Sequence, residues 1–307
     1  MIDRMSLEKS LRRVWKYNVL YALLLLPFAY YLIFQYVPLA GYVIAFKDYR
    51  LADGIFGSPW VGFQHFQELF ADPMFGRAFR NTITIGFLKL IFYFPAPIVL
   101  ALLLNEVGQK LFKNVVQTLV YLPNFLSWVI FGSLMYILLE PQFGPVNSVI
   151  ESLGGSSVSF MNRADLFQPV VVISDIFKSS GWVAIIYLAA LTSIDPQLYE
   201  AAKMDGAGRW QLIRHVTVPS IAMVIATMFI LQAGYFMSVG FEQIFILQNP
   251  IVLPTGDIID TLMYRDGIQQ ARFDFTTAIG IFNGVISFTL LFIVDRIAKR
   301  LDHPGVL

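Results

Sequence analysis

The sequence contains no cysteine, only three histidines and few charged residues for its 307 positions. The lack of cysteine excludes disulfides, thiolate nucleophiles and cysteine-ligated metals. Charged residues make up 14% of the chain and hydrophobic residues 57%, whereas a soluble domain has roughly a quarter of its residues charged. With a mean hydropathy of +0.64, this composition predicts an integral membrane protein. The net charge of +1 gives no electrostatic reason to expect nucleic-acid binding.

Motifs of catalysis and nucleotide binding are also missing. The sequence has no GxxxxGK(S/T) phosphate-binding loop, so if ATP drives its function another chain must bind the nucleotide. His65, His215 and His303 are scattered, and no HExxH or paired-histidine pattern predicts a metal site. No nucleophile elbow accompanies them. We therefore expect neither an enzyme active site nor a cofactor or metal bound by this chain.

The chain is instead rich in long apolar runs. A helix needs about 20 mostly apolar residues to cross the hydrocarbon core of a bilayer. Six runs are long enough: 19–46, 83–104, 115–139, 170–191, 218–247 and 275–294. They predict an all-α integral membrane protein with six transmembrane helices. Pro95 and Pro97 in the second run and Pro123 in the third predict kinks, which neighbouring helices can accommodate.

The distribution of Lys and Arg predicts the orientation of these spans. Both terminal tails are basic, and so are the loops that follow the second and the fourth runs. With six spans all four regions lie on one side, and basic flanks favour the cytoplasm. We therefore expect a multi-pass protein with both termini cytoplasmic. The first run is too long for the apolar region of a signal peptide, so we expect no cleavage there.

Two segments on the opposite side are not transmembrane but have helical character. In "GSPWVGFQHFQELF", Phe63, Phe66 and Phe70 recur at helical spacing, which predicts an amphipathic helix at the outer interface. Residues 143–155 predict a second short helix, which two consecutive glycines would stop.

The polar stretch "YEAAKMDGAGRWQLIRHVTVPS", residues 199–220, lies between two of the apolar runs. Pro196 can begin a short helix at its first turn. Gly206 and Gly208 would end that helix, and Pro219 precedes the next span. The pattern predicts a helix–glycine–helix elbow that offers small residues and carboxylates to a partner on the cytoplasmic side. The alternative is a solvated loop whose basic residues only reflect the charge asymmetry of membrane proteins.

Taken in order, these residues resemble the "EAA…G…LP" cytoplasmic signature of binding-protein-dependent ABC importer permeases, with "DGA" at 205–207 and Val218 where that family usually has Leu. The resemblance implies the type I ABC importer permease fold. It also implies that the elbow is the coupling helix, which docks into a cleft on a separate ATPase subunit. The coupling residues implied are Glu200, Ala201, Ala202, Asp205, Gly206, Arg209 and Pro219.

The resemblance extends over most of the chain. Residues 58–82, 258–268 and 275–300 resemble parts of carbohydrate importers, in particular maltose-type permeases for oligosaccharides derived from polysaccharides. It implies a complex in a bacterial plasma membrane, with a second homologous permease subunit and two ATP-binding subunits that use ATP and Mg. An extracytoplasmic solute-binding protein would deliver the carbohydrate, and the cavity would open alternately to either side.

The expected organisation follows from these features. It comprises a cytoplasmic tail at 1–18, a first transmembrane helix at 19–46, an extracytoplasmic loop with an amphipathic helix at 47–77, an ABC permease core at 78–295 with five transmembrane helices and the coupling loop 195–219, and a cytoplasmic tail at 296–307.

A few charged residues lie inside the expected spans, where each costs about 2.5–3.5 kcal/mol on insertion scales. Asp175 and Lys178 are three residues apart on one helical face, so they can pair with each other, either as a structural ion pair or within a solute site. Lys89 can pair across the bundle, with Asp175 or with the other permease.

An ion-gradient-driven secondary transporter, with Asp175 and Lys178 as its relay, is the alternative function. Polar stripes in the spans argue against a third possibility, a membrane anchor without a transport path.

Two stripes within the spans have the chemistry of a sugar site. Residues of the fourth run combine a carboxylate, a hydroxyl and an indole, and those of the fifth share a face at spacings of three and four. The resemblance to maltose-type permeases implies a mid-membrane sugar site between these two spans; ordinary aromatic packing is the alternative. The expected substrate-binding residues are Asp175, Lys178, Ser179, Trp182, Gln232, Tyr235 and Phe236. Glu242 and Gln243 are expected to cap a helix in the headgroup region rather than meet the solute.

Overall fold

The computed structural model describes residues 16–300, which are almost entirely helical. Four helices are long and apolar enough to cross a membrane, and two bent helix pairs raise the number to six if each pair is one span. This confirms the all-α membrane architecture expected from the sequence. Most of the expected cytoplasmic tails, at 1–15 and 301–307, lies outside the described residues.

The spans differ in their construction, since two of them are each one continuous helix and the others combine several helical segments. They comprise α2 (Asn18–Tyr31), α5 (Pro73–Leu88), α6 (Pro95–Glu106), α7 (Lys110–Tyr121), α8 (Trp128–Leu138), α10 (Ala164–Thr192), α14 (Ala222–Gly234), α15 (Phe241–Leu247) and α18 (Phe273–Arg300). Short π-helical or 3-10 segments extend them at Leu32–Tyr36, Val37–Phe46, Lys89–Tyr93, Leu122–Phe125 and Ile213–Thr217. The connecting elements are α3 (Gly54–Gly57), α4 (Gln64–Ala71), α9 (Pro145–Ser152), Phe160–Asn162, α11 (Pro196–Met204), α12 (Arg209–Leu212), α13 (Val218–Ser220), α16 (Leu253–Gly256), α17 (Ile259–Met263) and the π segment Tyr264–Gln269.

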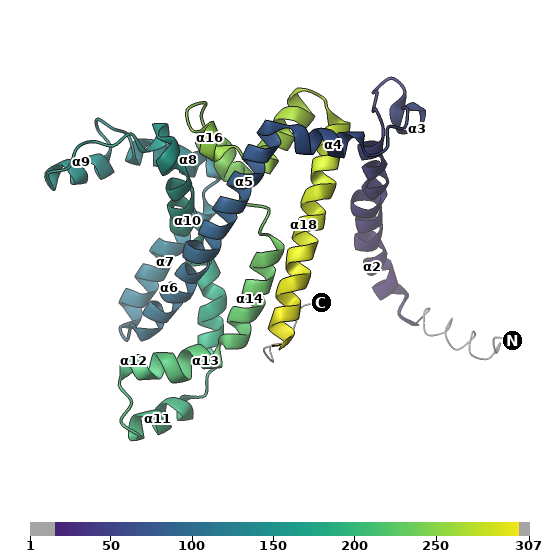
Figure 1. Cartoon of the computed structure of the whole chain (residues 1–307). Helices are drawn as coiled ribbons and strands as arrows, with labels where there is room; N and C mark the ends of the chain where they lie inside the picture. Colours follow the sequence, from purple (N-terminus) through teal and green to yellow (C-terminus); the bar gives the residue numbers. More distant parts are fainter. Residues whose placement is uncertain (1–15, 301–307) are drawn as a thin grey trace.

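The connecting helices lie at the two ends of the bundle (Figure 1). Helices α3, α4, α9 and α16 are at one end, whereas α11 and α12 project from the other. The first turn of α2 and the last turn of α18 lie at the same end as α11. The elbow, the start of α2 and the end of α18 are therefore on one side of the bundle, and the two amphipathic segments are on the opposite side.

The third span, expected at 115–139 with a kink at Pro123, is bent far more sharply than a kink. It bends by 108° between the α7 segment and α8. Pro123 opens the short 3-10 turn at this corner, Leu126 is extended, and Ser127 caps α8 by accepting a hydrogen bond from the Ile130 amide at 3.3 Å. Pro123 has no amide hydrogen to continue the helical hydrogen bonds. The Ser127 cap then begins a new helix in another direction, so the span turns a sharp corner instead of bending slightly.

The fifth span, expected as one run at 218–247, is also broken. The segment Arg209–Ser220 meets Ala222–Gly234 at 62°. Residues 235–240 are then non-helical, and Gly240 has a φ of +98°, which places it in a region that favours glycine. The span is therefore a half-helix α14, a break at 235–240 and a second half-helix α15.

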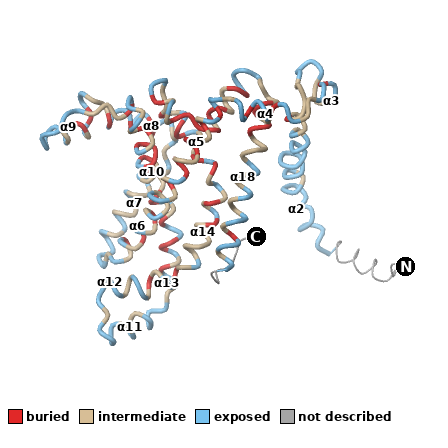
Figure 2. The backbone as a smooth tube through the Cα atoms, in the orientation of Figure 1, coloured by how far each residue is buried: buried red, intermediate tan, exposed pale blue. Residues whose placement is uncertain are grey.

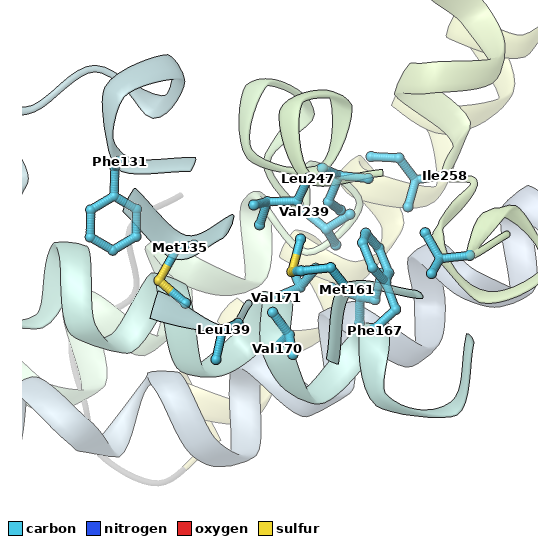
Figure 3. Packing of buried hydrophobic residues seen from close by; sticks show 13 residues of the cluster. Phe131, Met135, Leu139, Met161, Phe167, Val170, Val171, Val239, Leu247 and Ile258 are labelled. Carbon is cyan, nitrogen blue, oxygen red and sulfur yellow. The ribbon is translucent and has the colours of Figure 1, made fainter. Parts of the chain in front are cut away.

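The buried core lies toward the end that carries α16 (Figure 2). Its largest cluster is formed where α8, α10 and α15 meet, and Figure 3 shows Phe131, Leu139, Phe167, Val171 and Leu247 packed there. Helix α2, in contrast, has none of its residues buried. Its apolar surface is the kind that lipid or another subunit covers.

Candidate functional site

The elbow begins with a well-capped helix. Asp195 accepts a hydrogen bond from the Gln197 amide at 2.9 Å, which satisfies one of the free amides at the start of α11. After Met204 the chain turns at Gly206, whose φ is +83°. The Ala207 amide then donates to the Ala202 carbonyl at 3.0 Å. This is the left-handed glycine ending typical of helix C-termini, so the "DGA" sequence ends α11 as expected.

Most of the predicted coupling residues lie on the exposed surface of this elbow. Glu200, Ala201, Asp205, Gly206, Arg209 and Pro219 are exposed, and Ala202 is half-buried. Three apolar side chains are exposed beside them, which sequence analysis did not assign to coupling: Leu198, Met204 at 88% and Trp210 at 73%. Apolar residues within an otherwise polar loop were the signal available for them.

The elbow is hollowed on its inner side and tied to the next span. A hollow of 220 Å³ between α11 and the following segment is lined by residues that include Asp205, Gly206 and His215. The Tyr199 hydroxyl lies 3.1 Å from the hydroxyl of buried Thr217. Thr217 ends the π segment that leads through α13 into α14, so this hydrogen bond joins α11 to the start of the fifth span.

A buried polar centre lies between α5, α10 and α15. The Lys89 ammonium contacts Asp175 Oδ2 at 2.7 Å, the Gln243 amide oxygen at 2.8 Å and the Val239 carbonyl at 2.8 Å. The Ser179 hydroxyl donates to the other carboxylate oxygen of Asp175 at 3.1 Å. Of the pairings considered for Asp175, the one with Lys89 is formed, and the one with Lys178 is wrong.

Lys178 points away from Asp175 toward the corner of the third span. Its buried ammonium donates to the carbonyls of Pro123 at 3.4 Å and Asn124 at 3.1 Å, and lies 5.2 Å from the centre of the Trp128 ring. Both carbonyls belong to the 3-10 segment Leu122–Phe125, and the carbonyl end of a helical segment attracts a cation because of its partial negative charge. Helical spacing alone could not reveal this interhelical partner.

The predicted aromatic residues line two sides of this region. Trp182 is 48% exposed and packs edge-on against Phe125, with ring centres 5.6 Å apart. Tyr235 is 69% exposed and caps the end of α14. Tyr235 and Phe236 both lie after Gly234, the last residue of α14. They therefore do not share with Gln232 the helical face that the sequence predicted.

The turn after α14 nevertheless gathers these residues around a narrow cleft of about 10 Å³, which has room for about one water molecule. Gln232, Tyr235 and Phe236 line it together with Gly86 and Lys89. A Cβ atom at Gly86 would lie 2.9 Å from the Phe236 carbonyl oxygen, so the absence of a side chain allows α5 to approach the turn. Lys89 thus contacts Asp175 of α10, which accepts a hydrogen bond from Ser179, and lines the same cleft as the three predicted residues of the fifth span.

Gln243 is a member of the buried centre, and its expected role as a headgroup-region cap is wrong. Its amide group donates to the Val171 carbonyl at 2.6 Å and to the Ser174 hydroxyl at 2.9 Å, both on α10. Sequence analysis placed it at the outer end of a straight span. The break at 235–240 instead brings it inside, opposite Lys89.

A second polar cluster joins the connecting segments at the end of the bundle opposite the elbow. The fully buried Asp257 carboxylate contacts Arg77 at 3.2 Å and Arg265 at 3.0 Å. Its neighbour Asp266 is also buried, and burial raises the pKa of its carboxyl group, although Arg265 and Arg272 oppose this. The cluster joins α5 to the segment between α16 and α18 at the end opposite the elbow.

The described residues contain no group of three or more His, Asp or Glu side chains placed to hold a metal ion. Among residues 16–300, the acidic groups of the buried centre and of the outer cluster face Lys or Arg. The chemistry of both sites is hydrogen bonding and charge pairing.

Comparisons with known proteins agree with this geometry. Residues 93–303 match the family described as binding-protein-dependent transport system inner membrane component. The polygalacturonan/rhamnogalacturonan transport system permease protein YteP of Bacillus subtilis (strain 168) is 42% identical over 97% of this chain and 93% of its own. Protein LplB of the same organism is 43% identical over 94% of this chain and 90% of its own.

A similar solved structure carries the same arrangement of helices. In the crystal structure of a bacterial alginate ABC transporter in complex with an alginate pentasaccharide-bound periplasmic protein, one chain aligns with a TM-score of 0.89 and 41% identity. The alignment covers 96% of this chain and 99% of that one. With its exposed glycine-ended elbow and broken fifth span, this chain therefore belongs to the binding-protein-dependent ABC transport permeases of the inner membrane.

Proposed function

We propose that this chain is one permease subunit of an ATP-driven importer for an acidic oligosaccharide. The observation that carries the proposal is the elbow, an exposed helix connected through Tyr199 and Thr217 to the span that lines the buried cleft. Such a connection is what a separate motor subunit needs in order to move a transport path. The chain has no nucleotide-binding loop of its own.

The orientation and partners follow from the two ends of the bundle. The elbow end faces the cytoplasm, where two ATPase subunits bind ATP and Mg and grip α11 and its counterpart on a second, homologous permease. The end with α4, α9 and α16 faces outward and receives a solute-binding protein. Basic flanks at the elbow end support this orientation, and the alginate transporter was solved with a periplasmic protein bound.

The substrate class is a carbohydrate that bears carboxylates. Two of the similar proteins are named for polygalacturonan/rhamnogalacturonan and alginate transport. The buried centre is compatible with an anionic solute, because Lys89 neutralises Asp175. An unpaired carboxylate there would repel one.

The proposed substrate-contacting residues surround the cleft and the adjoining stripe of α10. Ser179 and Gln232 offer hydrogen bonds to hydroxyls, and Trp182, Tyr235 and Phe236 offer rings to the apolar faces of pyranoses. Asp175 acts through Ser179, whose hydroxyl it orients. Lys178 acts indirectly, since its ammonium holds the corner next to Phe125 and Trp182.

Transport then proceeds by alternating access. The loaded binding protein docks at the outer end, the two ATPases close on ATP, and their movement displaces α11. Displacement of α11 pulls on the π segment through Tyr199 and turns α14, which opens the cleft outward to take the sugar. Hydrolysis of ATP separates the ATPases and returns the cleft toward the cytoplasm. No covalent chemistry is required of this chain.

Proteoliposomes containing the full complex test the proposal. We expect sugar-loaded binding protein to stimulate ATP hydrolysis and uptake, and Glu200→Ala with Gly206→Asp to abolish both while the spans still insert. Loss of a docking contact at a desolvated interface commonly costs about 1–3 kcal/mol, enough to uncouple the subunits. Uptake that persists without ATP and follows an ion gradient would instead support a secondary transporter.

A further inference from the structure

The hydrogen-bonding capacity of Lys89 is fully used within the chain. Its ammonium is buried and contacts Asp175 Oδ2 at 2.7 Å, the Gln243 amide oxygen at 2.8 Å and the Val239 carbonyl oxygen at 2.8 Å. An ammonium has three N–H donors, and three acceptors surround this one. Lys89 therefore keeps no donor for a solute, although its side chain borders the cleft.

Two of the three partners belong to the break in the fifth span. Val239 lies in the non-helical residues 235–240, and Gln243 lies in the first turn of α15. The Gln243 amide group also donates to α10, at the Val171 carbonyl and the Ser174 hydroxyl. Lys89 and Gln243 thus fasten the end of the break and the start of α15 to α5 and α10.

The two halves of the fifth span have different neighbours. Helix α14 packs along α18 and continues downward into the elbow (Figure 1). Helix α15 packs mainly on α8 and α17, on the other side of the break, and both halves also contact α10. Because each half has most of its contacts with helices that the other half does not touch, the residues between them form a joint. Tyr235 and Phe236 begin that joint and line the cleft.

We propose that Lys89 is a positioning residue for translocation, which holds α15 and the break in place so that movement of the elbow bends the fifth span at residues 235–240. The bend would move Tyr235 and Phe236 relative to Lys89 and so change the shape of the cleft. This inference rests on the proposed import function. It assigns Lys89 a role distinct from solute binding and from neutralising Asp175.

Two variants separate these roles in the complete complex. Lys89→Met leaves the Asp175 carboxylate without its cation, so it can fail to assemble for that reason alone. Lys89→Met combined with Asp175→Asn removes both charges and keeps a hydrogen-bonding partner for Ser179. In both variants the Val239 carbonyl and the Gln243 amide oxygen lose their hydrogen bonds from the Lys89 ammonium. The double variant is therefore the decisive one.

We expect the double variant to assemble, with both permease subunits and the ATPase recovered in wild-type amounts. Its maximal uptake should fall about tenfold or more, within the range of a lost coupling between sites. The binding-protein concentration for half-maximal stimulation should change less than about twofold, because docking is unaffected. Lys47→Met is the matched control, since the Lys47 ammonium also binds backbone carbonyls, those of Ile55 and Phe56, but in the outer loop.

Distances within the complex test the joint directly. The chain has no cysteine of its own, so introduced pairs can carry spin labels in a complex with cysteine-free partners. Between the resting and vanadate-trapped states, we expect the distance from Met223→Cys on α14 to Ser133→Cys on α8 to change. The distance from Glu242→Cys on α15 to the same site should stay constant in the wild type and broaden in the double variant.

The outcomes are separable. A double variant that imports at the wild-type rate, or an α15 distance that changes together with the α14 distance, overturns the role of Lys89 and leaves the import function standing. A wild-type complex without ATP-dependent uptake contradicts the proposed function itself.

Discussion

At the scale of single residues, buried charges in this chain are satisfied by different means. Lys89 neutralises a carboxylate on another helix. Lys178 instead binds two backbone carbonyls at the end of the α7 segment and the face of Trp128. A cation at that position interacts favourably with the partial negative charge of a helix C-terminus. The Lys178 ammonium thus stabilises the backbone at the corner of the third span instead of neutralising another charge.

Lys178→Met should therefore weaken the corner. The partly buried Asn124 carbonyl would lose its donor, whereas the Pro123 carbonyl would keep its hydrogen bond from the Leu126 amide. Leaving one such group unsatisfied costs about 1–3 kcal/mol. We expect a lower thermal stability of the detergent-purified complex, measured by the loss of its monodisperse chromatographic peak on heating. Lys110→Met, at an exposed lysine, should leave the peak unchanged. Unchanged stability with lost sugar-stimulated ATPase would show that Lys178 binds the solute.

The sequence identified which residues inside the spans are unusual but not how they are satisfied. Asp175 and Lys178 were found because charges are rare in apolar runs. Their partners could not be deduced, since spacing along a helix says nothing about a neighbouring helix. Lys89 was paired with Asp175 only as one of several options. Gln243 was misplaced because its depth depends on the break before it.

At the scale of helices, close approach between α7 and α10 depends on one glycine. A Cβ atom at Gly181 would lie 2.0 Å from the carbonyl oxygen of Val120, far inside contact distance. The backbones of the two helices are thus in direct contact. Because α7 runs into the corner that carries Phe125, this contact also sets the position of the ring against Trp182.

Gly181→Ala should push α7 away from α10. Overpacking of this kind typically costs about 1–3 kcal/mol, and the displaced corner should reduce sugar-stimulated ATP hydrolysis as well. Gly284→Ala is the matched control, since no atom lies within 4 Å of a Cβ built there and the residue is also inside a helix. We expect that control to be neutral or slightly stabilising. Thermal stability and stimulated hydrolysis that match the control would contradict the packing argument.

Helix existence was predictable, whereas helix continuity was not. The six apolar runs correspond to the helices and bent pairs of the structure. Pro123 indicated a kink, but the 108° corner also needs the Ser127 cap, which acts only when the chain has already turned. The break at 235–240 contains no proline, and Gly240 alone is a weak signal within an apolar run.

At the scale of the whole molecule, the exposed surface indicates an incomplete assembly. Helix α2 has no buried residue, and the elbow extends beyond the bundle with apolar side chains on its surface (Figures 1 and 2). A bilayer can cover α2, but it cannot cover an elbow that lies beyond the ends of the spans. The signature residues of the elbow were recognisable from the sequence, whereas the exposure of Met204 and Trp210 required the folded chain.

Met204→Ser with Trp210→Ser should therefore release the ATPase while the permease remains intact. Large apolar side chains at the centre of an interface commonly contribute about 2 kcal/mol or more each, so the amount of ATPase that copurifies should fall at least about tenfold. Copurification on a tagged permease, with both permease subunits quantified, measures this. Leu51→Ser removes an exposed apolar side chain just before α3, which lies at the opposite end of the bundle, and should retain the ATPase. Full ATPase recovery with the elbow variant would mean that docking depends on the polar signature residues alone, whereas loss with Leu51→Ser as well would indicate general misassembly.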